Sequence, residues 1–229
     1  MAIFVEGQTE KIFVRKLLEE IAGKRNIAID EQEISGKKNS RITKLVMSDL
    51  ITIQTKYYIL IYNSGSDNSV ASDIRDQYKS LVASGYSMIM GLRDVYPIPA
   101  ADDKNKLEKG LQYALPKGSV PAHIILAVME IEAWFLAEWN HFMKVDASLT
   151  PVYIQAALGF NPEIEDMEKR PHPAEDLHQI YKLVGRSYRK RENQVNTIVS
   201  NLDYEFLYIQ LVNRVPSFGK FVGYIDAFI

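Results

Sequence analysis

Short apolar runs alternate with longer amphipathic segments through the first part of the chain, and this alternation restricts the fold more than any other feature. The apolar runs have the length and composition of buried strands. Runs of this kind are expected to form strands over residues 2–6, 57–62, 86–92 and 122–129, and the alternation of apolar and polar residues predicts another strand over residues 26–34. Apolar residues at helical spacing predict helices over residues 9–21, 41–51, 70–82, 103–115 and 131–139.

Strands separated by helices imply right-handed crossovers, and such crossovers place neighbouring strands parallel. We therefore predict an α/β fold, with a mostly parallel sheet flanked by helices as in Rossmann-like proteins. From Pro151 onward the sequence shows no clear strand, and residues 174–184, 193–202 and 204–212 are expected to be helical. The chain is thus expected to consist of an α/β core over residues 1–145 and a helical C-terminal region over residues 146–229.

The composition excludes several kinds of site. The 229 residues include no cysteine, which excludes disulfides, thiolate zinc sites and a cysteine nucleophile. The four histidines show no metal-ligand spacing, which argues against a histidine zinc site. The sequence has no apolar stretch long enough to cross a bilayer and no signal-peptide pattern, so we expect a cytoplasmic protein without a membrane partner.

The charge balance restricts how the chain could bind nucleic acid. A formal net charge of −2 differs from that of a strongly basic binding protein. Contact with nucleic acid would therefore depend on a local basic cluster or on a bridging metal ion. The densest cluster contains Arg186, Arg189, Lys190 and Arg191, which are candidates for phosphate contacts. An ordinary solvated helix face is the alternative interpretation.

Acidic residues follow several of the predicted strands. Glu6, Asp94, Glu130 and Glu132 stand at strand ends, and Asp67 lies in the loop after another strand. Because the carboxyl ends of parallel strands meet at one edge of a sheet, these carboxylates are expected to converge. Crowded carboxylates favour a hard divalent cation, Mg²⁺ or Mn²⁺. Taken singly, each acid also fits a solvated loop residue or a helix cap, and Glu130 and Glu132 fit the first turn of a helix.

Three segments resemble a known group of proteins. Residues 4–10, Phe-Val-Glu-Gly-Gln-Thr-Glu, followed by an amphipathic helix, resemble the opening of TOPRIM-like proteins. This group includes topoisomerase–primase domains, OLD-type nucleases, RloB-like proteins and a bacterial family of unknown function with members near restriction or phage-defence genes. Residues 130–137, Glu-Ile-Glu-Ala-Trp-Phe-Leu-Ala, resemble its late motif, and residues 215–221 resemble its C-terminal Ser-Phe signature.

The resemblance implies a TOPRIM-like core and a Mg²⁺-dependent nuclease that cleaves DNA or RNA, with a role in defence that would include a partner protein. It implies that Glu6 is a general acid/base or metal ligand and that Asp94 is the acid of the central motif. Glu132, together with Glu130, would supply the last metal-binding carboxylate. In the central motif the family has Asp-x-Asp, whereas this chain has a single acid, in Arg-Asp-Val-Tyr-Pro at residues 93–97. That departure favours the rival interpretation, a non-catalytic TOPRIM-like module that binds nucleic acid or a partner within a larger complex.

Overall fold

The computed structural model describes residues 1–36, 40–66, 69–95 and 101–229, with the backbone alone over residues 101–104. Asp67, one of the acids expected at the sheet edge, lies outside the described residues. The described residues group into two compact units. The first contains those of 1–94, 101–126 and 224–229, and the second contains Val95 and residues 127–223.

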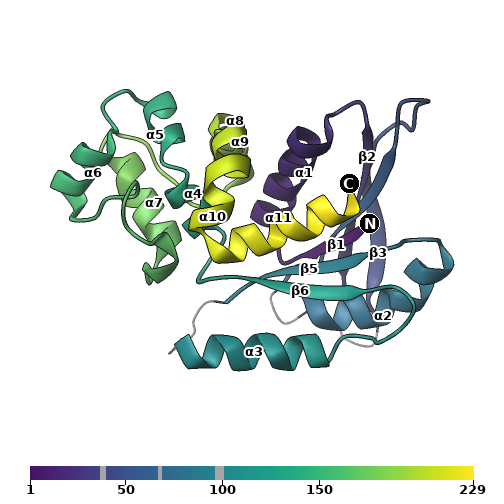
Figure 1. The fold of residues 1–229 in the computed structure, drawn as a ribbon. Helices are drawn as coiled ribbons and strands as arrows, with labels where there is room; N and C mark the ends of the chain where they lie inside the picture. Colours follow the sequence, from purple (N-terminus) through teal and green to yellow (C-terminus); the bar gives the residue numbers. More distant parts are fainter. Residues whose placement is uncertain (37–39, 67–68, 96–100) are drawn as a thin grey trace. The chain divides into compact units, whose positions relative to one another are not determined.

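The elements of the sheet unit alternate between strands and helices, as expected, except that β2, β3 and β4 follow one another without a helix between them (Figure 1). They are β1 (Ala2–Val5), α1 (Gln8–Ala22), β2 (Ile27–Ser35), β3 (Ile42–Ser48), β4 (Tyr57–Asn63), α2 (Val70–Ala83), β5 (Ile89–Asp94), α3 (Ala101–Tyr113) and β6 (Ala122–Ala127). Gly23 and Gly85, which follow the ends of α1 and α2, have left-handed φ angles of 78° and 83°. A side chain at these positions would be strained, which is why glycine ends these helices.

Within the described residues the sheet contains six strands in the order β3-β2-β4-β1-β5-β6. Strand β1 lies in the middle and pairs in parallel with β4 and β5, and β2 pairs in parallel with β4. Strand β3 runs antiparallel to β2 at one edge. The predicted α/β class with a mostly parallel sheet is therefore confirmed.

One predicted element is wrong. Residues 41–51 were expected to form a helix, but Ile42–Ser48 is the edge strand β3. Every residue of β3 is exposed, so no core contact selects its conformation. Its apolar residues, including Ile42, Leu45 and Val46, fit a helical spacing as well as a strand. Pairing with the preceding strand β2, which helical periodicity does not report, decides for the strand.

The central strand is buried on both faces because helices cover both (Figure 1). Ala2 and Phe4 belong to the core cluster that also contains Val70 and Ile74 of α2. Alternation along the strand directs their neighbours to the opposite face, the side of α1. Gly91 of β5 allows α2 to approach closely, since a Cβ atom there would lie 2.8 Å from Val70 and 2.9 Å from Ile74. Parallel strands with both faces covered read as continuous apolar runs, as they do in this sequence.

The second unit is helical in its described residues, as expected for the later part of the chain. Its elements are α4 (Glu132–Ala137), α5 (Asn140–Val145), α6 (Pro151–Leu158), the 3₁₀ helix η1 (Met167–Lys169), α7 (Pro173–Lys182), α8 (Glu192–Asn201), α9 (Tyr204–Phe206), the π-helix η2 (Leu207–Leu211) and α10 (Val212–Arg214), followed by α11 (Pro216–Phe228), whose last residues belong to the first unit. The unit begins at Ala127, earlier than the boundary expected after residue 145, because α4 packs against α7 and α5 packs against α8. None of the described helices is long and apolar enough to cross a membrane.

Candidate metal centre

Two of the expected acids lie side by side at the ends of neighbouring parallel strands. Glu6 follows β1, and Asp94 is the last residue of β5. The register pairs Val5 with Leu92, so the two strand ends are adjacent. The backbone N–H of Asp94 donates a hydrogen bond to Oε2 of Glu6 over 3.0 Å. The parallel pairing thus brings Glu6 and Asp94 together, as the sequence predicted.

The backbone that follows Asp94 is held against the segment that carries the other two acids. The N–H of Val95 donates to the carbonyl oxygens of Ala127 and Met129, each over 3.1 Å. Met129 has a left-handed φ angle of 64°, which is uncommon for a residue with a side chain. The next residue is Glu130, so this strained turn determines where Glu130 leaves the end of β6.

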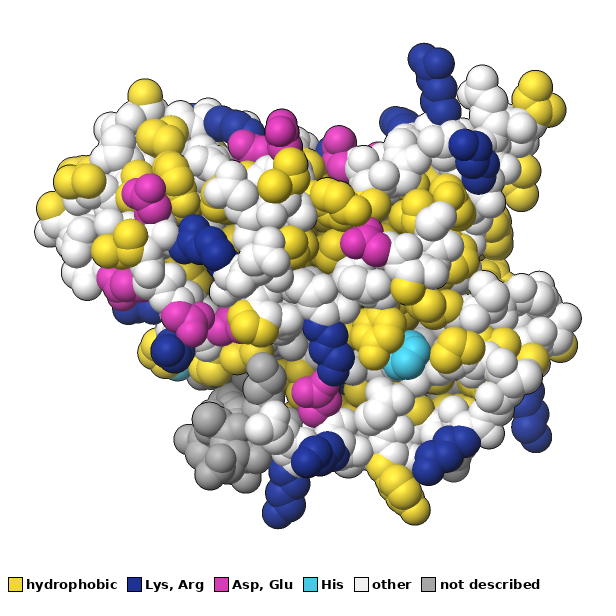
Figure 2. Space-filling view, in the orientation of Figure 1, with side chains coloured by type: hydrophobic (Ala, Val, Ile, Leu, Met, Phe, Trp, Pro, Cys, Tyr) yellow, Lys and Arg dark blue, Asp and Glu magenta, His cyan; other side chains and the backbone are white. Residues whose placement is uncertain are grey.

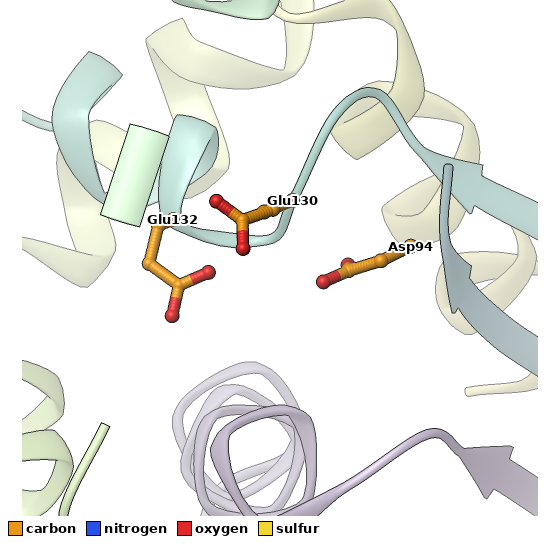
Figure 3. A group of neighbouring side chains, drawn as sticks. All are labelled: Asp94, Glu130 and Glu132. Atoms are coloured by element: carbon orange, nitrogen blue, oxygen red, sulfur yellow. The ribbon is translucent and has the colours of Figure 1, made fainter. Parts of the chain in front are cut away.

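Asp94, Glu130 and Glu132 form the one acidic group in the described residues that could hold a metal ion. Each offers one carboxylate oxygen, and these oxygens lie within 4.8 Å of one another. Figure 3 shows the three side chains extending into a common space. Asp94 and Glu132 are buried and Glu130 is half-buried. An all-oxygen donor set of this kind suits Mg²⁺ or Mn²⁺ better than zinc.

Glu132 is the most deeply placed of these acids, with no exposed surface. The hydroxyl of Tyr188 donates to its Oε1 over 2.7 Å, and Nζ of Lys190 lies 3.1 Å from its Oε2. Burial raises the pKa of Glu132, while the Lys190 ammonium and the Tyr188 hydroxyl lower it. The carboxylate is therefore held in place by a cation and a hydroxyl, and its charge is exposed to little solvent.

Glu130 has two contacts of different kinds. Its Oε2 accepts the backbone N–H of Ala174 over 3.1 Å, in the first turn of α7. Its Oε1 lies 2.9 Å from Nζ of Lys190. The expectation of an acid in a first helical turn fits Glu132, which begins α4, whereas Glu130 caps α7 instead. Sequence reasoning missed this contact because the two segments are distant in the chain.

The basic cluster does not act as one patch in the structure. Lys190 contacts the acids, while Arg189 pairs with Glu175 over 3.4 Å. Arg186 lines a separate cavity of about 150 Å³, and Arg191 precedes α8. On the face shown in Figure 2, Lys and Arg side chains are scattered among Asp and Glu. The binding of nucleic acid by all four residues remains a prediction, and the structure places Arg189 and Lys190 at one cavity and Arg186 at another.

Tyr188 is a site residue that the sequence analysis did not select. It is buried, and its hydroxyl reaches Glu132 across 56 positions of sequence. The only signal was an aromatic residue inside a basic run, which would otherwise be expected in solvent.

The two later segments of the TOPRIM-like resemblance lie in contact with each other. The indole N–H of Trp134 donates to Oγ of Ser217 over 2.8 Å, and the indole packs against Phe218 and Phe221. Trp134 is fully buried, as expected for a core residue. These contacts explain why an aromatic residue after Glu132 and a Ser-Phe pair near the C-terminus occur together in this chain.

Comparison with known proteins gives a family and no further relative. Residues 5–226 match the family model described as "Domain of unknown function (DUF4276)". No curated protein and no solved structure matches the chain.

Proposed function

Since the chain belongs to the DUF4276 family, whose description states no activity, we propose a function from the carboxylate site itself: Mg²⁺- or Mn²⁺-dependent cleavage of phosphodiesters in DNA or RNA. The observation that carries the proposal is the group formed by Asp94, Glu130 and Glu132, whose oxygens lie within 4.8 Å. The resemblance to TOPRIM-like nucleases supports the same reaction class. A defence role with a partner protein is part of this proposal and depends on the resemblance alone.

The donor set fits the proposed ion. Asp94, Glu130 and Glu132 would hold it, and a bound Mg²⁺ would supply charge stabilisation at the phosphate and an activated water. Burial of Glu132 favours this role, because a buried carboxylate is stabilised most when a cation lies directly beside it. Tyr188 fixes one oxygen of Glu132 by its hydrogen bond. The second oxygen faces the cation position, where Lys190 now lies.

Glu6 has a positioning role in this proposal. Its Oε2 accepts the backbone N–H of Asp94 and so fixes the end of β5 from which the Asp94 carboxylate projects. E6Q keeps an amide oxygen that can accept this N–H, so a loss of cleavage in E6Q would come from loss of the general acid/base role that the resemblance implies.

A nuclease assay with Mg²⁺ or Mn²⁺ tests the proposal on single- and double-stranded DNA and RNA. D94N and E6Q should each lower metal-dependent cleavage by about 100-fold or more while the protein stays folded. D76N is the matched control, since Asp76 is an exposed residue of α2, and it should cleave like the wild type. Unchanged cleavage in both D94N and E6Q would show that the site is assigned wrongly.

The second candidate function is the non-catalytic module. The single acid in residues 93–97 favours it, because fewer carboxylates remain for two-metal chemistry. Binding of an oligonucleotide by the wild type, without cleavage of any substrate in either metal, would select this alternative.

A further inference from the structure

The ammonium of Lys190 contacts two of the proposed metal ligands, Glu130 and Glu132. Its Nζ atom is 2.9 Å from Oε1 of Glu130 and 3.1 Å from Oε2 of Glu132. A Mg²⁺ ion would bind the same oxygens at about 2.0–2.1 Å. Two cations cannot share these oxygens without strong repulsion, so a bound metal must move the ammonium away.

The backbone of Lys190 shows that this placement is held by its surroundings. Its φ angle is 53°, in the left-handed region. Among the non-glycine residues that the structure describes, Met129 alone shares this feature, and it directly precedes Glu130. Such conformations cost free energy and persist where neighbouring contacts enforce them. Both strained residues therefore flank the same carboxylates.

An open cavity adjoins Lys190 within the second unit. It has a volume of about 410 Å³, and Glu130, His172, Tyr188, Arg189 and Lys190 contribute to its lining, with Ala174 and Glu175. This volume lies within the range of about 300–1,000 Å³ that small-ligand sites occupy. The side chain of Arg189 is 57 % exposed there and pairs with Glu175 over 3.4 Å, a surface ion pair that costs little to exchange.

We infer that this cavity is a phosphate subsite coupled to the metal centre. A divalent cation at Glu130 and Glu132 displaces the Lys190 ammonium into the cavity, where Lys190 and Arg189 bind a phosphate oxygen of the substrate. The inference rests on the proposed metal site and adds where the substrate phosphate lies. Because the two binding events are linked, metal must strengthen phosphate binding and phosphate must strengthen metal binding by the same factor.

Mn²⁺ binding to K190Q tests the displacement. Removal of the competing charge should tighten Mn²⁺ binding by about tenfold or more, measured by titration of free Mn²⁺ with electron paramagnetic resonance. R189Q is the matched control and should bind Mn²⁺ like the wild type, because Arg189 pairs with Glu175. Equal or weaker Mn²⁺ binding by K190Q would overturn the inference.

K190Q leaves Glu132 without its cation, so its folding is followed by thermal unfolding with and without Mn²⁺. A variant that is unstable alone and stabilised by Mn²⁺ supports the inference, since the metal then replaces the ammonium. A variant that stays unfolded at saturating Mn²⁺ contradicts it, because Lys190 would then be a structural cation that no metal replaces.

Phosphate binding is tested with a fluorescent phosphorothioate oligonucleotide, which resists cleavage. In the wild type, Mn²⁺ should raise its affinity by about tenfold relative to EDTA. R189Q should lose most of this gain, while K144Q, which alters an exposed lysine of α5 outside the cavity, should keep it. A gain that survives in R189Q and K190Q would overturn the subsite.

Competition by inorganic phosphate and by a mononucleotide identifies the source of the bound phosphate. Displacement at similar concentrations by both shows a site for a free phosphate group, whereas displacement only by longer strands shows a polynucleotide site. A protein that shows the coupling but cleaves nothing would contradict the proposed function and leave this inference standing. A protein that cleaves but shows no coupling between metal and phosphate binding would support the proposed function and contradict this inference.

Discussion

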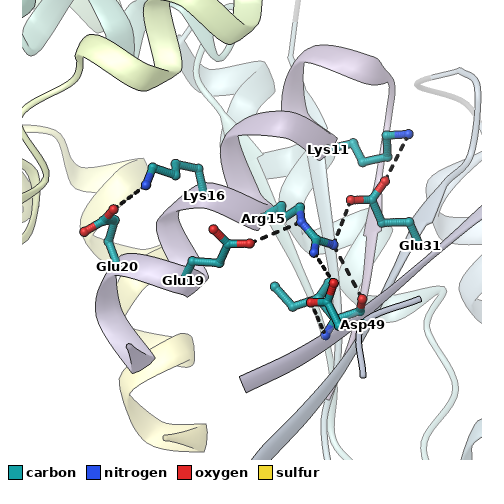
Figure 4. A network of polar contacts seen from close by, with 8 residues as sticks. Lys11, Arg15, Lys16, Glu19, Glu20, Glu31 and Asp49 are labelled. Carbon is teal, nitrogen blue, oxygen red and sulfur yellow. Dashed lines mark hydrogen bonds and ion pairs between the residues drawn. The ribbon is translucent and has the colours of Figure 1, made fainter. Parts of the chain in front are cut away.

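Two groups of charged side chains in this protein hold inward-facing carboxylates in different ways. In the first unit, Arg15 of α1 contacts three acids (Figure 4). Its Nε lies 3.3 Å from Glu19, its Nη1 3.0 Å from Glu31 and its Nη2 2.5 Å from Asp49. In the candidate metal centre, a single ammonium, that of Lys190, lies between Glu130 and Glu132.

The difference lies in the cation. A guanidinium presents donors in a fixed plane, so each nitrogen of Arg15 has its own carboxylate and the arrangement is rigid. Lys11 adds a further contact to Glu31 over 3.3 Å. An ammonium is a compact charge on a flexible stem, and a metal ion can take its place. The Arg15 network thus fastens α1 to β2, whereas our inference requires the Lys190 contact to be exchangeable.

The largest expected effect comes from removal of the Arg15 guanidinium. R15M removes one of the two cations beside the carboxylate of Glu31, which is 5 % exposed, together with the contacts to Glu19 and Asp49, and should lower the free energy of unfolding by about 3 kcal/mol. Urea unfolding followed by circular dichroism measures this change. A loss below about 1 kcal/mol would mean that the Arg15 network contributes no more than ordinary surface ion pairs, and that it does not differ from the Lys190 contact in this respect.

Replacement of the Lys190 ammonium by a guanidinium tests whether the type of cation makes the contact exchangeable. In K190R the guanidinium should contact Glu130 and Glu132 through two nitrogens and resist displacement. Mn²⁺ should therefore bind about tenfold more weakly, a loss of about 1.4 kcal/mol in binding free energy. Isothermal titration calorimetry with the wild type as reference measures the affinity. Tighter Mn²⁺ binding by K190R would show that the ammonium does not compete.

The pH dependence of stability should differ between the wild type and E132Q in metal-free buffer. Burial raises the pKa of Glu132 above its ordinary value of 4.5, so its contribution to stability is complete below 4.5 and is lost as the pH rises through the raised pKa. The wild type should therefore lose up to about 1.4 kcal/mol per pH unit from this group within that window. Thermal unfolding between pH 4 and pH 8 measures how steeply stability falls with pH, and E132Q should reduce this slope. Parallel stability curves for the wild type and E132Q would contradict the raised pKa of Glu132.

The smallest expected effect concerns the outer acid of the Arg15 network. E19Q removes a contact of 3.3 Å within one helix, between side chains that are 18 % and 15 % exposed. The expected loss of unfolding free energy is about 0.5 kcal/mol. Urea unfolding beside R15M gives the ratio of the two losses, and a loss equal to that of R15M would mean that Arg15 acts mainly through Glu19.

Much of the fold and part of the site follow from local pattern. The strands at residues 2–6 and 86–92 are mostly apolar, and parallel pairing of such strands brings the acids at their ends, Glu6 and Asp94, together. The edge strand β3 could not be predicted in this way. Its residues are exposed, so no buried face shows its conformation, and pairing with β2 decides it.

The sequence by itself determined the order of strands and helices apart from β3, and with it the approach of Glu6 to Asp94 at adjacent strand ends. Tertiary structure alone decided that Glu130 caps α7, that Tyr188 reaches Glu132, and that Lys190 lies on both acids. Periodicity reports which face of an element is buried, because burial repeats with the geometry of the backbone. Contacts between residues some 40 to 60 positions apart depend on the path of the intervening helices, which no local repeat records.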